Sequence, residues 1–324
     1  GASTEVPYLN PNVKILYLST RKNLHQYFYD PKSKKYTLKT NENKDGSHTF
    51  LNYGNTFVSI VYNKDIIDQT SFKDALPNTT NELKMLSAEI NSKGKATWLF
   101  YNNDDNNGYW DYLSNAWAAQ YDGLDYFNNT LLQLGGPNAS KEEAKQIYIK
   151  QDGRYKALQT MESVITNANS HTKCSSTNFA DVQNLFIDGE SALNINGGWL
   201  LKEYSKTGTG LKHEFGMMKL PVISSIVETF EGDDKNMSDK TLASIISEID
   251  NGATSSSKCS NKTFARLVEA RSILSNNAPQ QYVFIPSYSN CIDGSKEFLR
   301  YFYSDKGTKT FMEKTNFPAS VRLS

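Results

Sequence analysis

The segment NINGGW, residues 194–199, places two glycines directly before a tryptophan. The indole ring of Trp199 is a flat apolar surface, and the amide of Asn196 can hydrogen-bond a hydroxyl. Gly197 and Gly198 would let the backbone approach a ligand closely and adopt positive φ, and a helix starting after Trp199 would add free N–H groups. These residue types suit a sugar, which has apolar C–H faces and rims of hydroxyls. The alternative is that Trp199 packs between two domains or inside the second one.

A second aromatic group opens a helix that we expect over 109–123, after an Asn/Asp-rich loop at 102–108. Tyr109 and Trp110 are its first residues. Trp117 falls seven residues after Trp110, which puts the two rings on nearly the same helical face. A plain core helix therefore explains this pair as well as a ligand site does.

Two further candidates, Tyr53 and Asn55, precede a strand expected at 56–62, and would lie at the entrance of a cleft beside it. Asp104 and Asp105 could bind an ion or hydroxyls, although a solvated loop is the favoured interpretation.

Strands alternate with helices along the sequence, which predicts an α/β fold. These strands and helices must position the candidate residues. The helices carry recognisable start signals, with capping-box spacing between Thr79 and Glu82 and between Ser140 and Glu143. The stretch up to residue 47 is expected as loop or short strands, and 231–262 as a loop-rich insertion around one helix. We expect strands at 13–18, 56–62, 96–101, 193–195 and 282–286, and helices at 79–94, 109–123, 153–167, 179–186, 239–250, 262–275, 293–303 and 305–314.

The composition excludes several classes of protein. The 324 residues hold 35 basic and 35 acidic side chains, so the chain lacks the basic surface of a nucleic-acid binder. Aromatic residues make up 12%, which argues against disorder. No apolar run is long enough to span a bilayer, and no signal-peptide segment is present. The length favours about two domains.

Metal and enzyme motifs are missing from the sequence. The three cysteines, Cys174, Cys259 and Cys291, have no metal-ligand spacing, and could form one disulfide or remain reduced. The chain contains no GxSxG, P-loop, HExxH or GxGxxG motif. We therefore expect a protein that is not an enzyme and uses no cofactor.

Three stretches together resemble the extracellular solute-binding proteins of ABC importers, in the carbohydrate-binding family that includes maltose-binding protein. VYNKDII (61–67) and PNTTNELKML (77–86) are similar to that family's tyrosine-asparagine-lysine-aspartate element and the helix start after it. FIDGESALNINGGWL (186–200) resembles its asparagine-glycine-X-tryptophan segment, and residues 289–318 resemble its C-terminal helices. The match runs in order over roughly residues 50 to 320.

The chain departs from the family pattern in a few places. Asn81 stands where a tryptophan is usual, and Asn316-Phe317 stands where glycine is common. The family usually has a full βαβ unit ahead of the first motif, whereas about fifty residues precede it here, with one clear strand. The N-terminal lobe is therefore expected to be shortened or incomplete.

The resemblance implies a periplasmic-binding-protein-like type II fold, with two lobes and a ligand cleft. The N-terminal lobe would comprise 1–100 with a return segment within about 220–292, and the C-terminal lobe 101–220, followed by the C-terminal helices at 293–324. The family has a ligand-stacking tryptophan at the position of Trp199, and aromatic residues that face the cleft at the helix opening that matches Tyr109 and Trp110.

The function implied is capture of a mono- or oligosaccharide by hinge closure, for delivery to the membrane permease of an ABC importer. Such a protein is a monomer located outside the cytoplasmic membrane, as a cell-surface lipoprotein or in the periplasm, and it binds no nucleic acid. A glycan-processing enzyme or a surface carbohydrate adhesin is the alternative, and a shortened protein without a sugar function is a third.

Overall fold

The computed structural model describes residues 27–30, 35–38, 51–52, 57–101, 109–132, 134–135, 138–200, 203, 211–273, 275–276, 282–286 and 288–315. The chain divides into two compact units. Unit 1 comprises Gly1–Phe57 and Asn276–Ser324, and unit 2 comprises Val58–Ser275. The division into the lobes expected from the sequence stays a prediction.

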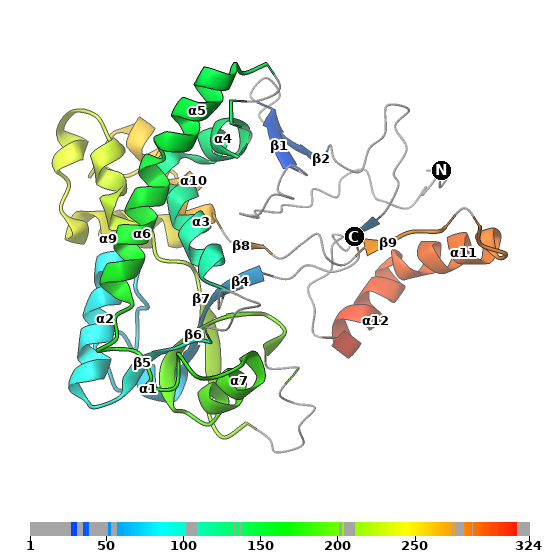
Figure 1. Cartoon of the computed structure of the whole chain (residues 1–324), viewed down its shortest axis with the longest axis horizontal. Coiled ribbons are helices and arrows are strands. Elements are labelled where there is room, and N and C mark those ends of the chain that lie inside the picture. The colour runs from blue at the N-terminus through cyan, green and yellow to red at the C-terminus, as the bar shows by residue number, and fades with distance from the viewer. Residues whose placement is uncertain are drawn as a thin grey trace. The chain divides into compact units, whose positions relative to one another are not determined.

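Unit 2 is built on a mixed sheet in the order β5-β6-β4-β7 (Figure 1). Strand β6 is parallel to β5 and antiparallel to β4, which in turn is antiparallel to β7, while β8 also pairs with β4. This arrangement confirms the α/β prediction and the strands expected around 56–62, 96–101 and 193–195. The strands are β4 (Phe57–Asn63), β5 (Ala96–Leu99), β6 (Ser191–Gly197), β7 (Phe215–Met218) and β8 (Ser275–Asn276).

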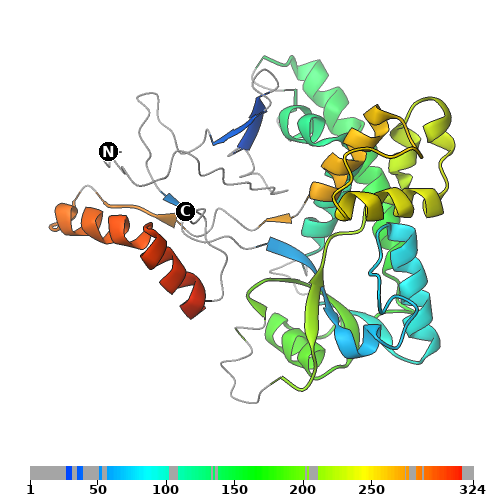
Figure 2. The same cartoon turned by 180° about the vertical axis from the view of Figure 1, so that it is seen from behind.

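Helices pack on both the sheet and one another in unit 2. Helix α7 contacts β6, α2 contacts β5, α3 contacts α6, and α9 and α10 lie side by side when seen from behind (Figure 2). The helical elements are α1 (Lys64–Ile67), α2 (Thr80–Ser92), α3 (Trp110–Asp122), α4 (Leu124–Tyr126), η2 (Phe127–Leu131), α5 (Lys141–Ile149), α6 (Asp152–Val164), α7 (Phe179–Ile187), η3 (Ser224–Thr229), η4 (Gly232–Asn236), α9 (Asp239–Asp250) and α10 (Asn261–Ser272). The helices predicted in this region are confirmed within a few residues at their ends.

The two predicted capping boxes differ in the structure. At α5 the box is complete, because Ser140 accepts from the N–H of Glu143 and the Glu143 carboxylate accepts from the N–H of Ser140. At α2 only half of it forms. Thr79 accepts from the N–H of Glu82, but the Glu82 carboxylate accepts from the N–H of Asn78 instead.

Two fully buried tryptophans show how the core satisfies its polar atoms. The indole N–H of Trp98 donates to the carbonyl of Val164 at 3.1 Å, and that of Trp117 donates to the carbonyl of Pro221 at 3.0 Å. Tyr112 is buried as well, at 1% exposure. Trp117 and Tyr112 therefore belong to the core face of α3, whereas Trp110, the other member of the predicted pair, is half-buried.

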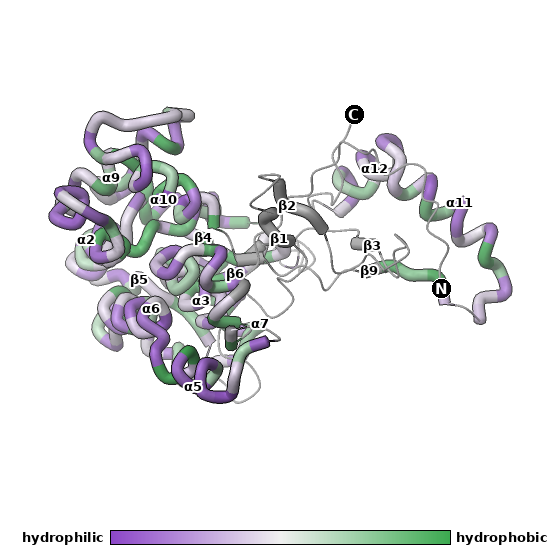
Figure 3. The backbone as a smooth tube through the Cα atoms, turned by 90° about the horizontal axis from the view of Figure 1, so that it is seen from above, coloured by the Kyte–Doolittle hydropathy of each residue, from purple (hydrophilic) through white to green (hydrophobic). Residues whose placement is uncertain are grey.

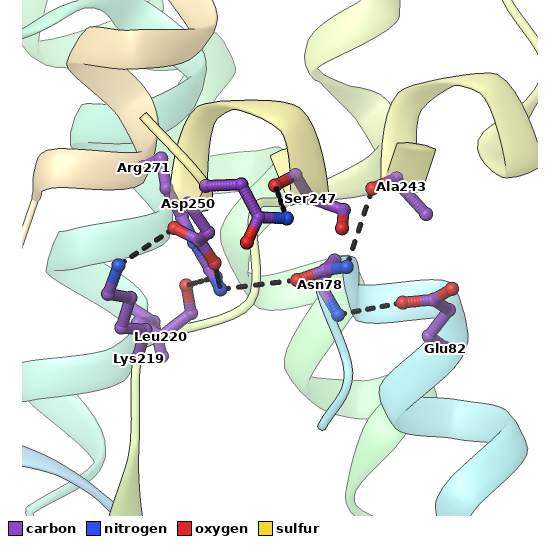
Figure 4. Close-up of polar contacts among 9 residues, drawn as sticks. Asn78, Glu82, Lys219, Leu220, Ala243, Ser247, Asp250 and Arg271 are labelled. Atoms are coloured by element: carbon purple, nitrogen blue, oxygen red, sulfur yellow. Dashed lines mark hydrogen bonds and ion pairs between the residues drawn. The ribbon is translucent and has the colours of Figure 1, made fainter. Parts of the chain in front are cut away.

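Four elements of unit 2 meet at a polar cluster around Arg271 of α10 (Figure 4). Its guanidinium forms an ion pair with Asp250 of α9 at 2.6 Å and donates to the carbonyl of Leu220 and to the side-chain oxygen of Asn78. Lys219 also donates to Asp250, at 2.8 Å. Burial acts to raise the pKa of Asp250, but the hydrogen bonds and charges of Arg271 and Lys219 outweigh it and leave that pKa below its ordinary value.

A different junction joins α3 to α6 at Asp122. One carboxylate oxygen accepts from the N–H of Gly153 at 3.1 Å, so α3 caps the first turn of α6. A Cβ on Gly153 would come within 2.3 Å of the Asp122 carboxylate, which explains why a glycine lies there. Burial raises the pKa of Asp122 to about 6, assisted by the negative charge of Asp152, because the opposing effects of the Gly153 N–H and the Arg266 charge are smaller.

The described residues of unit 1 form two small antiparallel strand pairs and two helices. The region expected as loop or short strands forms β1 (Tyr27–Asp30) paired with β2 (Lys35–Leu38), and β3 (Leu51–Asn52) pairs with β9 (Tyr282–Val283). Helices α11 (Ile292–Phe302) and α12 (Asp305–Thr315) contact each other and confirm the predictions at 293–303 and 305–314. Apolar and polar residues alternate along both helices (Figure 3). The predicted strand at 13–18 and the NFPAS stretch at 316–320 lie outside the described residues.

All three cysteines are free thiols in the structure, which agrees with one of the two alternatives left open by the sequence. Among the described residues, no group of His, Cys, Asp or Glu could hold a metal ion. No helix in the described part of the chain is long and apolar enough to cross a membrane.

Candidate functional site

Trp199 lies two residues beyond the end of β6, in the turn before a helical segment. The N–H of Glu203 donates to the carbonyl of Trp199 at 3.0 Å, which is the spacing of a first helical turn. The ring of Trp199 is half-buried, whereas the next residue, Leu200, is 1% exposed and belongs to the core. The strand thus delivers one aromatic side chain to the surface and the next apolar one to the interior.

The glycines before Trp199 have a reason that differs from the one predicted. Neither Gly197 nor Gly198 adopts positive φ, so that expectation is wrong. A Cβ on Gly197 would lie 2.1–2.3 Å from three atoms of the Trp199 ring, whereas a Cβ on Gly198 would meet nothing within 4 Å. Gly197 is therefore needed by the tryptophan ring itself, and Gly198 is open to solvent.

Tyr109 stands beside Trp199, with ring centroids 6.1 Å apart and an interplanar angle of 79°. It also makes edge contacts with Tyr101, Tyr112 and Phe179, at centroid distances of 5.9, 5.5 and 5.8 Å. We call these five rings the aromatic cluster. Two predicted site residues, Trp199 and Tyr109, are thus brought together from segments ninety residues apart.

The backbone of Tyr109 is strained. Its φ of 61° and ψ of 16° are left-handed, a conformation that L-residues other than glycine, asparagine and aspartate seldom adopt. Tyr109 lies immediately ahead of α3, which begins at Trp110. Its left-handed conformation positions the ring among the four other rings of the cluster. Ring contacts of this type stabilise by about 0.5–1.5 kcal/mol each, enough to offset the strain.

Trp110 points to a different neighbour. Its ring packs edge-on against Phe100, at a centroid distance of 4.3 Å, and is half-buried. Among the described ring contacts, Trp110 makes none with Trp199. The predicted candidates Tyr53 and Asn55, together with Asp104 and Asp105, lie outside the described residues.

Asn196 uses its amide inside the sheet. Its side-chain oxygen accepts from the N–H of Gly197 at 2.8 Å, and its nitrogen donates to the Asn194 side chain at 3.0 Å. Asn194 in turn donates to the carbonyl of Leu99 on β5 at 2.6 Å. Asn196 is only 1% exposed, so in this conformation the amide pair ties β6 to β5 rather than facing solvent. A ligand contact by Asn196 stays a prediction.

Tyr101 and Phe179 are members of the cluster that were not predicted from the sequence. Tyr101 lies two residues after the end of β5, as Trp199 lies two residues after the end of β6, and the two strands are parallel. The carboxyl ends of parallel strands lie at the same edge of a sheet, which is the signal that could have identified Tyr101. Phe179 starts α7, and nothing in its local sequence distinguishes it from a core residue.

The amino end of β6 joins two of the motifs that carry the family resemblance. Gly189 has a φ of 85°, which ends α7, and a Cβ there would lie 2.5 Å from the His213 ring. His213 pairs with Asp65 of the YNKD element at 2.8 Å, and Lys212 pairs with Asp188 at 3.0 Å. Because Gly189 has no side chain, the His213 ring can lie against it. His213, just before β7, can then pair with Asp65 in α1, close to the start of β6.

Comparison with known proteins shows similarity at the level of fold. No family model and no curated protein matches the chain. The solute-binding protein RafE in complex with raffinose is similar over 86% of this chain and 59% of its own, with 14% identity and a TM-score of 0.56. The apo form of RafE from Streptococcus pneumoniae is similar over 88% and 60%, with 15% identity and a TM-score of 0.50. A family 1 extracellular solute-binding protein from Bifidobacterium longum subsp. infantis follows, with 16% identity over 87% and 58% and a TM-score of 0.46.

The chain has the α/β fold of the two-lobed solute-binding proteins, which confirms the predicted fold class. It spans about three fifths of the length of these structures. The identities are too low to carry a ligand or a transport role across, and the more specific similarity to maltose-binding protein stays a prediction.

Proposed function

We propose that the chain is the extracellular substrate-binding component of an ABC transporter and captures a mono- or oligosaccharide. The fold shared with RafE, which was solved with raffinose, supports a solute-binding role. The aromatic cluster supports a sugar as the solute, because aromatic rings are the side chains that stack on sugar C–H faces.

The observation that carries the proposal is the placement of Trp199. It is the half-buried ring at the end of an otherwise buried strand, it is held beside Tyr109, and an open glycine precedes it. A tryptophan needed only for the core would be covered on all sides, as Trp98 and Trp117 are at 0% exposure. An aromatic surface left accessible next to bare backbone suits a ligand better than it suits packing.

The remaining parts of the proposal follow from the resemblance. The protein would act as a monomer outside the cytoplasmic membrane, as a lipoprotein or in the periplasm, and deliver its sugar to a membrane permease. Binding would be coupled to closure of two lobes around a hinge, driven by higher affinity for the closed state. Gly198 and Asn196 are proposed as backbone and amide contacts, with Tyr53, Asn55 and Trp110 as further candidates.

The test begins with a thermal-shift screen of glucose, galactose, maltotriose, raffinose and chitotriose. A sugar that binds only the folded chain raises its melting temperature. For the sugar with the largest shift, we expect Trp199→Ala to weaken the affinity measured by calorimetry by about tenfold or more, since about 1.4 kcal/mol corresponds to a factor of ten. The melting temperature without ligand should change little, because the ring is partly solvent-exposed.

Tyr148→Ala is the matched control, because Tyr148 is an aromatic residue 68% exposed on α5. It should leave the affinity unchanged. Equal affinity of the Trp199 variant and the wild type would contradict the proposed site. Cleavage products after incubation with the oligosaccharides would identify an enzyme instead.

A further inference from the structure

Trp199 and Gly197 are in contact through a face of the indole ring. A Cβ on Gly197 would lie 2.1 Å from Cζ3, 2.2 Å from Cη2 and 2.3 Å from Cε3 of Trp199, three consecutive atoms of the six-membered ring. A point beyond the rim of the ring and in its plane cannot be nearly equally close to three consecutive atoms. The missing Cβ therefore lies over the ring, and the indole stacks on the bare Cα of Gly197.

The backbone under the ring is fixed. Gly197 is the last residue of β6, pairs with Val58 of β4, and is itself buried. Its N–H donates to the side chain of Asn196, which is locked to Asn194 and through it to β5. A side chain added at Gly197 could not be accommodated by a shift of the strand, so the tryptophan ring would have to leave its place.

The ring is also confined from a second direction. Tyr109 stands almost perpendicular to it, and is held by contacts with Tyr101, Tyr112 and Phe179. The left-handed backbone of Tyr109 places its ring in this position. Contact with Gly197 therefore fixes the height of the indole ring above the strand, and contact with Tyr109 limits its sideways movement.

We infer that Gly197 is a positioning residue, which occupies one face of the Trp199 ring and leaves the opposite face to stack on a sugar. This inference rests on the proposed function, and it changes the role of Gly197 from a ligand contact to the support of one. It also narrows the ligand: the ring offers one face, so the sugar must present an apolar face from the side away from β6.

Gly197→Ala tests the inference, and Gly198→Ala is its control for ring placement. The two substitutions add the same methyl group one residue apart, but only the first would meet the ring. The measurement is acrylamide quenching of tryptophan fluorescence in a Trp110→Phe background. Trp98 and Trp117 are 0% exposed, so the quenchable emission of that background comes from Trp199.

We expect Gly197→Ala to raise acrylamide quenching and Gly198→Ala to leave it unchanged. Gly197→Ala should also weaken binding of the sugar selected in the screen by about tenfold, close to the effect of Trp199→Ala, because both remove the positioned ring. Tyr148→Ala serves again as the control for affinity.

A loss of stability would not obscure the result. If Gly197→Ala lowers the melting temperature, the double variant with Trp199→Ala should recover it, since the added methyl group then has no ring to meet. Failure to recover, or quenching of Gly197→Ala equal to that of Gly198→Ala, would overturn the inference while leaving the proposed function intact. If no sugar binds but quenching rises as expected, the proposed function fails and the support of Trp199 by Gly197 stands.

Discussion

Asp250 and Asp122 are two carboxylates of unit 2 that lie close to arginines, yet their pKa values are shifted in opposite directions. The pKa of Asp250 is below its ordinary value, whereas burial raises that of Asp122 to about 6. Burial opposes ionisation at both sites. What differs is whether the arginine donates hydrogen bonds to the carboxylate or only acts on it from a distance.

At Asp250 the arginine is directly engaged. Nε and one terminal nitrogen of Arg271 both donate to the carboxylate, and Lys219 adds a third donor (Figure 4). At Asp122 the guanidinium of Arg266 is used elsewhere. It pairs with Glu269 at 2.7 Å and donates to the carbonyls of Gln120 and Tyr121.

One oxygen of Asp122 is buried without a hydrogen-bond partner among the described residues. The comparison shows that proximity of opposite charge is insufficient when the donors of the arginine are committed to other acceptors. A buried carboxylate stays ionised only when such donors form hydrogen bonds to it.

Removing Arg271 should have the largest effect. Arg271→Ala leaves Asp250 without its main partner, and the carbonyl of Leu220 and the side-chain oxygen of Asn78 lose a donor. We expect a loss of about 3 kcal/mol in the free energy of unfolding, measured with urea. The double variant Arg271→Ala, Asp250→Ala should lose less than the sum of the single variants, and additive losses would show that the pair is not coupled.

Asp122→Asn should have an intermediate effect that depends on pH. Because the folded pKa lies above that of an unfolded aspartate, about 3.9, the folded chain binds the extra proton. The stability from this group is complete below about pH 4 and is lost as the pH rises through about 6. The asparagine variant should therefore gain stability relative to the wild type on going from about pH 4 to about pH 7, by about 1 kcal/mol after discounting for partial exposure.

Melting temperatures of both proteins across this range measure the difference. Asp74→Asn is the matched control, because Asp74 is an exposed aspartate of the same unit and is not among the charges that shift the pKa of Asp122. A stability difference between wild type and Asp122→Asn that is constant with pH would contradict the assignment.

Removing Lys219 should have the smallest effect. Its side chain is 60% exposed, and Arg271 keeps its bonds to Asp250 when Lys219 is absent. Lys219→Ala should reduce the free energy of unfolding by about 0.5 kcal/mol or less and raise the pKa of Asp250 slightly. A loss as large as that of Arg271→Ala would mean that the lysine contributes as much as the guanidinium to keeping Asp250 ionised.

Local patterns predicted the elements of this chain but not its junctions. The β-branched strand at 56–62 and the capping box at Ser140 follow from neighbouring residues alone, whereas the sequence left the core position of Trp117 as one of two alternatives. Arg271 and Asn78 are 193 positions apart, and their contact depends on how four elements pack. No spacing rule connects such residues in a single sequence.

The candidate site shows the same limit. The tryptophan after two glycines singled out the segment that the structure brings beside Tyr109, because its residue types are unusual together. Its neighbour Tyr109 was proposed through the family resemblance, whereas Tyr101 and Phe179 required the sheet order. The positive φ expected at Gly197 was wrong, because the sequence shows that space is needed at this position but not which atoms fill it.

The three thiols differ in their exposure to solvent, and this makes the chain suitable for distance measurements without any substitution. Cys291 is exposed in unit 1, Cys259 is half-buried in unit 2, and Cys174 is buried. Burial and the charges of Asp234 and Glu248 raise the pKa of Cys259, which slows its reaction with maleimides. A first dye can therefore be attached at Cys291 and a second at Cys259, so that energy transfer reports the separation of the two units with and without sugar.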